Sequence, residues 1–353
     1  MTKMMKALTQ SAAALTVAAG LGSVAAPANA QTTYTKDNPL KVALVLNGTL
    51  GDKSFFDSAQ RGMDQAMKDL PVVVKTIEPG YNRGNWQPAL ADAADGDYDV
   101  VIAGTFDMAG FVAEIAPQYP DKKFILFDDT VDYSKGGFDN VLSVQYRTST
   151  AAYLAGYAAA KVSKTGTLSQ ILGTEGSVIL EFVVGFEQGA KAANPNVKLL
   201  RATVNSANPF SDPAKGKELA LAQIQQGSDV VFPIAGSTGI GALQAVRDSK
   251  KLAIGVDSDQ AVIFSATDPA QADVILTSVE KRVGESLFLI LKQTVEGTAK
   301  YGTSSILGLQ EGAVGISKNK YYDALVPEAV RKEVDEQEKK IISGEIKVET
   351  TMN

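Results

Sequence analysis

The sequence contains neither cysteine nor histidine. Disulfides, thiolate nucleophiles, Cys/His zinc sites and a Ser-His-Asp triad are therefore impossible. Carboxylate pairs or a Ser/Lys pair could still act as catalytic groups. However, no Gly-x-Ser-x-Gly elbow and no Walker loop occurs. We therefore expect a binding protein rather than an enzyme, with no catalytic residue, no cofactor and no metal ligand.

The chain also lacks an excess of positive charge. Residues 1–30 carry two lysines and no acidic residue, so the remaining 353 − 30 = 323 residues have a net charge of (34 − 2) − 40 = −8. This acidic balance argues against nucleic acid or an anionic membrane as a partner. A chain of that length corresponds to about two domains.

Residues 1–30 match the pattern of a signal peptide. Lys3 and Lys6 precede an alanine-rich apolar run, and the segment ends in Ala28-Asn29-Ala30. The run is too short, and too rich in Ala, Gly and Ser, for a membrane span; an ordinary N-terminal helix is the alternative. No cysteine follows the predicted cleavage site, so we expect a soluble protein without a lipid anchor.

Strand-like and helix-like segments alternate along the rest of the chain. Apolar runs of strand length lie at 42–46, 72–78, 99–104, 123–129, 141–146, 167–173, 198–205, 229–236, 251–259 and 272–279. Helical patterns lie between and after them, at 54–70, 85–95, 110–120, 150–164, 178–194, 213–227, 238–250 and 281–298. Repeated βα units of this length predict parallel sheets with helices on both faces.

Two halves of similar α/β pattern follow one another. The fold class that this predicts is α/β, with two doubly wound parallel-sheet lobes and a cleft between them. We assign residues 40–145 and 280–300 to an N-terminal lobe, and residues 146–279 and 301–353 to a C-terminal lobe. A hinge joins the two. A charged helix that begins at Pro327 and ends before Gly344 is typical of a solvated surface.

The turn after the first strand carries the clearest functional signal. Asp52, Ser54, Phe55 and Phe56 lie where that strand ends and a helix begins. Ligands bind at the carboxyl ends of strands in open α/β sheets. The spare N–H groups of a helix start favour an anion, whereas two adjacent aromatic residues favour a flat ring. The alternative is that one of the two phenylalanines belongs to the core.

Further candidates follow the other strands. They are Phe106, Asp107, Asp128, Asp129, Phe210, Asp212, Lys215, the glycine turn from Gly236 to Gly241, Asp257, Asp259 and Lys281. An aspartate at a strand end often caps a helix or forms a turn instead, and a glycine turn can serve close packing alone. All of them fall at the same edge of their sheets, which favours a shared site.

Several phrases resemble one known family. GDKSFFDSAQRG, YPDKKFILFDD, YLAGYAAAKVSKTG, AIGVDSDQ and ILTSVEKRV, together with the long stretch from Phe210 to Val246, are similar to the basic membrane protein (Bmp/PnrA-like) family. Its members are substrate-binding components of ABC importers for purine nucleosides. The resemblance runs from about Lys41 to Ser343. It implies a type I periplasmic-binding-protein fold, a small-molecule ligand and a membrane permease as partner. The predicted signal peptide indicates a periplasmic location, and we expect a monomer.

The resemblance also implies roles for individual residues. Phe55 and Phe210 match the two phenylalanines that sandwich the base in the family. Asp257 and Lys281 match the residues that bind the ribose hydroxyls, and an Asp with a Lys suits a vicinal diol. Asp128 and Gly236 match positions close to the sugar. Asp52 and Ser54 match the Asp-Lys-Ser of the first turn.

The chain departs from the family pattern on the base side of the site. Gly51 and Phe56 replace an Asp and an Asn of the family turn. Gly110 stands where the family tends to have an Asp that accepts from the base, although Asp107 lies one turn earlier. Hydrogen-bonding groups discriminate strongly between ligands. These departures therefore leave the exact ligand open.

The leading hypothesis is a solute receptor that closes over a nucleoside-like ligand. A receptor of the same fold for a free base, a sugar or a signal molecule is the first alternative. A nucleoside hydrolase would need a metal or a carboxylate cluster. A transcriptional regulator would need a DNA-binding helix-turn-helix. The predicted leader occupies the place of that motif and the rest of the chain is acidic, so we reject this alternative.

Overall fold

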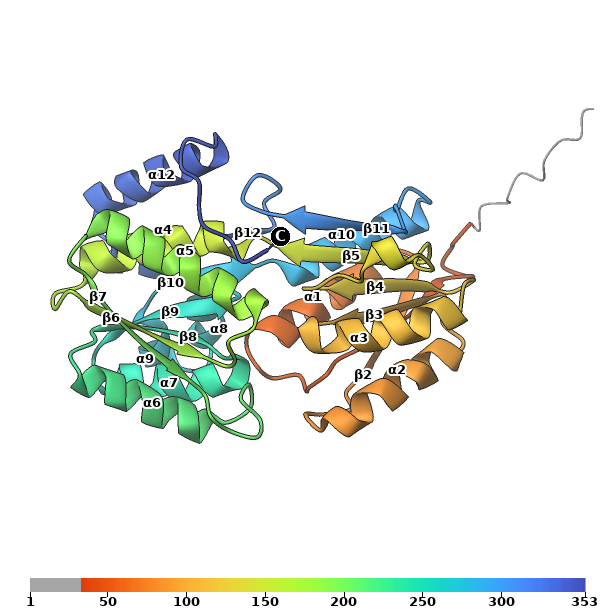
Figure 1. Ribbon diagram of the computed structural model, residues 1–353, viewed down its shortest axis with the longest axis horizontal. Coiled ribbons are helices and arrows are strands. Elements are labelled where there is room, and N and C mark those ends of the chain that lie inside the picture. Colours follow the sequence, from red (N-terminus) through yellow and green to blue (C-terminus); the bar gives the residue numbers. More distant parts are fainter. Residues whose placement is uncertain (1–32, 353) are drawn as a thin grey trace, which may run out of the picture. The chain divides into compact units, whose positions relative to one another are not determined.

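The computed structural model describes residues 33–352, so the predicted leader at residues 1–30 lies outside the described residues. Two six-stranded sheets follow one another along the chain, and helices cover both faces of each (Figure 1). This arrangement confirms the predicted α/β fold with two doubly wound lobes. Within residues 33–352, no helix combines the length and the apolar character that crossing a bilayer would require.

The first sheet has the order β11-β5-β4-β3-β1-β2, and all its neighbouring strands are parallel. Its strands are β1 Leu40–Val45, β2 Val72–Ile77, β3 Val100–Gly104, β4 Lys123–Phe127, β5 Val141–Tyr146 and β11 Thr303–Leu307. The central strands are almost continuously buried, because helices cover both faces. Their apolar runs explain why the sequence predicted them.

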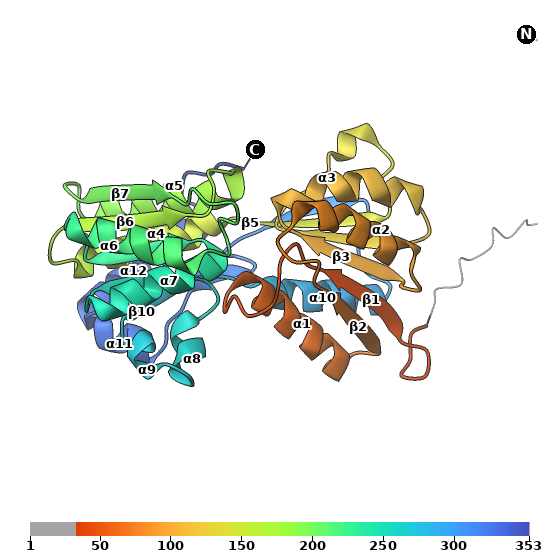
Figure 2. The same cartoon turned by 90° about the horizontal axis from the view of Figure 1, so that it is seen from below.

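Alternate residues of β1 face two different cores. Leu40 and Leu44 on one face pack against α1 Phe55–Asp69 and α10 Val283–Val295, while Ala43 and Val45 pack toward α2 Trp86–Asp95 and α3 Phe106–Ile115. Short 3₁₀ turns complete this part of the chain: η1 Arg83–Asn85, η2 Ala116–Gln118 and η3 Tyr133–Lys135. Figure 2 shows α1 beside α10 below the sheet.

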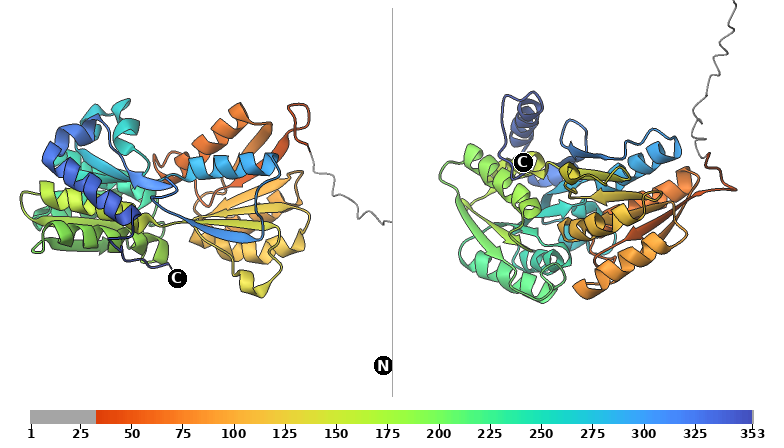
Figure 3. Two further views of the ribbon diagram at one scale, coloured as in Figure 1. Left: turned by 90° about the horizontal axis from the view of Figure 1, so that it is seen from above. Right: turned by 45° about the vertical axis from the view of Figure 1, so that its right-hand side comes forward.

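The second sheet has the order β12-β10-β9-β8-β6-β7, in which only β12 is antiparallel to its neighbour. Its strands are β6 Thr167–Leu172, β7 Lys198–Thr203, β8 Val230–Ile234, β9 Leu252–Asp257, β10 Ile275–Lys281 and β12 Val314–Ile316. The helices are α4 Thr148–Val162, α5 Ser177–Ala193, α6 Pro213–Gln225, α7 Gly236–Asp248, α8 Gln260–Ser265, α9 Pro269–Ala272, α11 Lys320–Leu325 and α12 Glu328–Ile342. The last described residues pass beside α5, where Thr350 and Thr351 bond to the buried Glu181 (Figure 3).

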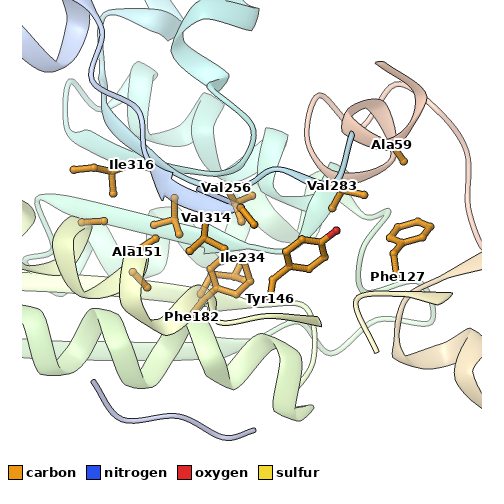
Figure 4. Close-up of a cluster of buried hydrophobic side chains, with 14 of the residues drawn as sticks. Ala59, Phe127, Tyr146, Ala151, Phe182, Ile234, Val256, Val283, Val314 and Ile316 are labelled. Carbon is orange, nitrogen blue, oxygen red and sulfur yellow. The ribbon is translucent and has the colours of Figure 1, made fainter. Parts of the chain in front are cut away.

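The chain passes between the two sheets three times, from β5 to α4, from β10 to α10 and from β11 to β12. We call residues 34–146 and 283–307 the N-terminal lobe, and residues 148–281 and 314–352 the C-terminal lobe. One apolar cluster runs through both lobes. Figure 4 draws part of it, with Tyr146 at the end of β5 lying between Phe182 of α5 and Phe127 of β4.

These bounds differ from the predicted ones near the C-terminus. Residues 301–353 were all assigned to the C-terminal lobe, but β11 pairs with β5 in the first sheet. Lys281 was assigned to the N-terminal lobe and is the last residue of β10 in the second sheet. The segment TSSIL of β11 is largely exposed and has no apolar pattern, so only its pairing with β5 reveals where it belongs.

Candidate ligand-binding site

A cavity of about 340 Å³ lies between the lobes, at the carboxyl ends of strands from both sheets. The order of each sheet reverses between two strands, β1 and β3 in the first and β6 and β8 in the second. Ligands of doubly wound folds bind at such switch points. Asn47 and Thr105 line the cavity after β1 and β3, and Thr174 and Gly236 line it after β6 and β8.

Backbone strain gathers at the same strand ends. Thr105, Asp128 and Asp257 have φ angles of 78°, 68° and 62° and all line the cavity. L-residues with side chains reach this left-handed region at a cost of about 1–3 kcal/mol each. The left-handed backbone changes the direction of each side chain at the end of its strand. Strain that gathers around one cavity in this way indicates a functional site.

The structure brings most of the predicted site residues together. The predicted residues that line the cavity are Asp52, Phe55, Phe56, Phe106, Asp107, Asp128, Phe210, Gly236, Asp257 and Lys281. Ser54, Asp129, Asp212, Lys215 and Asp259 are predicted residues that do not line it. Ser54 is buried and bonds to residues of the other lobe instead. The contact of each residue with a ligand stays a prediction.

The inner end of the cavity is built around a buried ion pair. Lys281 Nζ lies 2.7 and 2.9 Å from the two carboxylate oxygens of Asp128. The pair joins β10 of one lobe to the end of β4 of the other, and both side chains are buried. Burial raises the pKa of Asp128 to about 6, although Lys281 opposes the shift. The negative charge of the Asp257 carboxylate also raises the pKa of Asp128.

Ser54 connects the lobes at the same end. Its hydroxyl donates to Asp257 Oδ2 at 2.7 Å, and its carbonyl accepts from the Ser258 hydroxyl at 2.9 Å. Burial raises the pKa of Asp257, and the charge of Lys281 together with the bond from Ser54 opposes the rise. Because Ser54 belongs to the N-terminal lobe and Asp257 to the C-terminal lobe, this bond orients Asp257 only when the lobes are together.

Asp52 serves the turn more than the cavity. Its carboxylate accepts from the backbone N–H groups of Ser54, Phe56 and Asp57 at 2.9–3.1 Å. It therefore satisfies the free N–H groups at the start of α1. Burial raises the pKa of Asp52 to about 6, against the effect of these bonds. Asp52 therefore caps α1, which is the alternative role given above for strand-end aspartates.

Aromatic rings form the middle of the cavity. Phe55 stacks near Phe127 with centroids 5.4 Å apart and meets Phe56 edge-on at 5.5 Å. Phe210 of the C-terminal lobe has its centroid 6.4 Å from Phe106 of the N-terminal lobe. The resemblance predicts that Phe55 and Phe210 enclose the ligand ring, and in the structure Phe106 lies beside Phe210. The rings of both lobes thus face one cavity.

The outer end holds a second ion pair. Arg83 Nη1 lies 2.5 Å from Asp107 Oδ1, and the guanidinium lies over the rings of Trp86 and Phe111. Asp107 lies at the start of α3, where its side chain reaches the cavity. Gly110, one turn later, does not line it, and open space surrounds the position of a Cβ there.

Several lining residues were not predicted from the sequence. They include Asn47, Tyr81, Arg83, Trp86, Thr105, Thr174 and Phe182. Asn47 follows the first strand directly, so its position was a usable signal. Tyr81 and Arg83 come from the β2–α2 connection, which has no motif, and Trp86 is the first residue of α2. Phe182 lies in the middle of α5 and looks like any core residue of an apolar helix.

Other predicted candidates lie elsewhere. Asp212 and Asp259 cap α6 and α8, which is the alternative role given above for strand-end aspartates. Lys215 forms an ion pair with Glu218. Asp129 forms an isolated bridge with Val144 outside the cavity. Within residues 33–352, no group of three or more acidic side chains is placed to hold a metal ion.

The family of the chain follows from sequence comparison. Residues 40–351 match the family model described as Bmp, ABC transporter substrate-binding protein PnrA-like. This chain belongs to that family. A CD4+ T-cell-stimulating antigen of Listeria innocua is 32% identical, over 87% of each chain. Basic membrane protein A of Borreliella afzelii is 31% identical, over 87% of this chain and 90% of its own.

Solved structures agree with this assignment. An ABC transporter solute-binding protein of Aeropyrum pernix K1 is 26% identical, with a TM-score of 0.77 over 89% of this chain and 94% of its own. A myo-inositol binding protein of Caulobacter, 20% identical with a TM-score of 0.59, covers 83% of this chain and 97% of its own, and shares the fold. The Bmp-family chain therefore has the type I periplasmic-binding-protein fold. It is a solute-binding protein of an ABC transporter, not an enzyme, and its partners are a solute and a permease.

Proposed function

We propose that this Bmp-family protein captures a nucleoside-like ligand, with purine nucleosides as the first candidates, and delivers it to its permease. The observation that carries the proposal is the combination of groups in one cavity. Buried Asp257 and Lys281 form its inner end, and aromatic rings from both lobes line it, with Phe55 beside Lys281. A nucleoside combines the same two features, a hydroxylated sugar joined to a flat ring.

The sugar belongs at the inner end. A carboxylate accepts from two neighbouring hydroxyls, and an ammonium donates to the same oxygens. The base then lies among the phenylalanines. Each aromatic pair adds about 0.5–1.5 kcal/mol beyond the area that it buries. Phe55 of one lobe and Phe210 of the other are the predicted walls, and Phe106 joins them beside Phe210.

Ligand capture proceeds by hinge closure. The lining residues come from both lobes, and three chain crossings join the lobes. A ligand that contacts both lobes stabilises the closed arrangement by the difference in its affinity for the closed and open forms. We further propose that residues 1–30 direct export to the periplasm and are removed there, and that the mature protein acts as a monomer without a lipid anchor.

A sugar receptor is the second candidate, because the inner end alone suits a diol. The two candidates differ in what the aromatic middle contributes. If a sugar is the ligand, Phe210→Ala weakens binding less than Asp257→Ala does. If a nucleoside is the ligand, both substitutions weaken it strongly.

Thermal-shift measurements on the purified protein test the proposal. The panel contains nucleosides, free bases and sugars at equal concentrations. We expect the largest rise in Tm with a purine nucleoside, since a ligand that binds only the folded state raises Tm. Stabilisation by a sugar, with none by any nucleoside or base, would overturn the proposal.

A further inference from the structure

We propose that Arg83 reads the ring edge of the ligand and makes the protein prefer 6-oxopurine nucleosides over 6-aminopurine nucleosides. This inference rests on the proposed function and adds the class of base. Arg83 follows β2 at the start of η1 and lines the outer end of the cavity. Its side chain is 61% exposed, whereas the ion pair of Asp128 and Lys281 is buried.

The guanidinium of Arg83 is held in place before any ligand arrives. Asp107 binds one of its terminal nitrogens at 2.5 Å, and its central carbon lies 5.4 Å from the ring centroids of both Trp86 and Phe111. Trp86 is itself buried, and its ring N–H donates to the Gly80 carbonyl at 2.7 Å. A planar guanidinium fixed in this way loses little entropy when it binds a further group.

Arg83 has donors left for a ligand. Among residues 33–352, the Arg83 side chain donates a hydrogen bond to Asp107 alone, so its Nε and second terminal nitrogen remain available. A guanidinium can donate but cannot accept. The ligand edge that it meets must therefore present acceptors. The O6 and N7 atoms of a 6-oxopurine are two adjacent acceptors, whereas a 6-aminopurine has an amino donor beside N7.

Asn47 gives an independent indication on the same wall. Its Nδ2 donates to Thr105 Oγ1 at 2.9 Å, and the same oxygen accepts from the backbone N–H of Asp107 at 3.2 Å. Asn47 Oδ1 is buried and has no partner among the described residues, although Asn47 lines the cavity. A buried acceptor without a partner loses the hydrogen bonds that water would give it. A ligand N–H would satisfy it.

Donors from Arg83 and an acceptor from Asn47 match one type of edge. A 6-oxopurine has a ring N–H at N1 next to its carbonyl, whereas a 6-aminopurine has an unprotonated N1 next to its amino group. A 6-aminopurine would turn an amino N–H toward the N–H groups of Arg83 and the lone pair of N1 toward the Asn47 oxygen. Sites that hydrogen-bond a ligand reject such mismatches far more strongly than apolar pockets do.

Binding of inosine and adenosine tests the inference. The chain has a single tryptophan, Trp86, and it lines the cavity, so its fluorescence reports binding and calorimetry gives Kd. The variants are Arg83→Met and, as a matched control, Arg201→Met, since Arg201 forms an ion pair with Glu187 and does not line the cavity. The protein is used as the full mature chain.

We expect the wild type and the control to bind inosine at least about 10-fold more tightly than adenosine, as one bidentate contact discriminates by about 1–3 kcal/mol. Arg83→Met should weaken inosine binding by about 10-fold or more and change adenosine binding by less than about 3-fold. Equal losses for both ligands, or no preference in the wild type, would overturn the inference while leaving the proposed function intact. Failure of the wild type to bind any nucleoside would overturn both.

Discussion

The two ends of the cavity each contain an ion pair, and the pairs differ in how they are built. At the inner end, the side chains of Lys281 and Asp128 are 2% and 6% exposed and come from different lobes. At the outer end, those of Arg83 and Asp107 are 61% and 27% exposed and come from one lobe. The inner pair can therefore link ligand binding to lobe closure and stability, while the outer pair is free to select the ligand.

Burial explains the difference in expected energy. Breaking a buried pair leaves one charge without water or a partner, which costs several kcal/mol. An exposed pair loses little, because water replaces the partner. The same contrast applies to the hydrogen bonds, since Ser54 and Asp257 meet in a buried position between the lobes. Substitutions at the two ends can break or sharpen this contrast, from the largest expected effect to the smallest.

Lys281→Met should have the largest effect on stability. It leaves the buried carboxylate of Asp128 unpaired, so we expect the free energy of unfolding to fall by about 3–5 kcal/mol in urea denaturation. Lys215→Met, which breaks an exposed pair with Glu218, is the control and should cost about 1 kcal/mol or less. Equal losses in the two variants would contradict the distinction between buried and exposed pairs.

The inner pair should also give a pH dependence. The pKa of Asp128 is about 6 in the folded protein and near 3.8 in a model compound, so the folded state holds the proton more tightly. The contribution of Asp128 to the free energy of unfolding is complete below about pH 4 and is lost as the pH rises to about 6. By linkage this amounts to about 3 kcal/mol.

Comparison with Asp128→Asn isolates that contribution. The unfolding free energy of the wild type minus that of the variant should fall between pH 4 and pH 6, and urea titrations at several pH values measure it. A difference that stays constant or rises across this range would show that burial does not raise the pKa of Asp128.

Ser54→Ala should have an intermediate effect. It removes the hydroxyl that donates to the buried Asp257, so we expect a loss of about 1–3 kcal/mol in unfolding free energy. Because Asp257 is then no longer oriented across the lobes, nucleoside affinity should fall by about 10-fold in calorimetry. The half-buried Ser265, whose hydroxyl donates to the Val262 carbonyl and which lies outside the cavity, provides the control Ser265→Ala. Unchanged affinity in Ser54→Ala would refute the orienting role.

Arg83→Met should have the smallest effect on stability. The pair with Asp107 is exposed, so the unfolding free energy should change by about 1 kcal/mol or less. Thermal or urea unfolding without ligand measures it. A loss as large as that of Lys281→Met would mean that the outer end supports the fold rather than selecting the ligand.

The sequence predicted those elements whose signal is local. The buried strands β1 and β3 are continuous apolar runs, Asp257 ends β9, and Phe55 and Phe106 begin the helices that follow β1 and β3. In contrast, β11 is exposed and belongs to the first sheet only through its pairing with β5. Nothing in its own residues indicates this.

Much of the site depends on contacts between distant segments. Ser54 reaches Asp257 and Phe210 reaches Phe106 only because the lobes meet. The position of Arg83 depends on rings from α2 and α3, which approach it only in the folded lobe. Strand ends could therefore be predicted as candidates, whereas their partners and the roles of Ser54 and Asp52 required the structure.

Calorimetry with inosine, ribose and hypoxanthine tests the central claim most directly, namely that one cavity binds a sugar at its inner end and a base among its aromatic rings, toward the outer end. Each fragment meets only one end, and a joined ligand pays the cost of association once. We predict that inosine binds at least about 100-fold more tightly than either fragment. Ribose binding as tightly as inosine would contradict the claim and identify a sugar receptor instead.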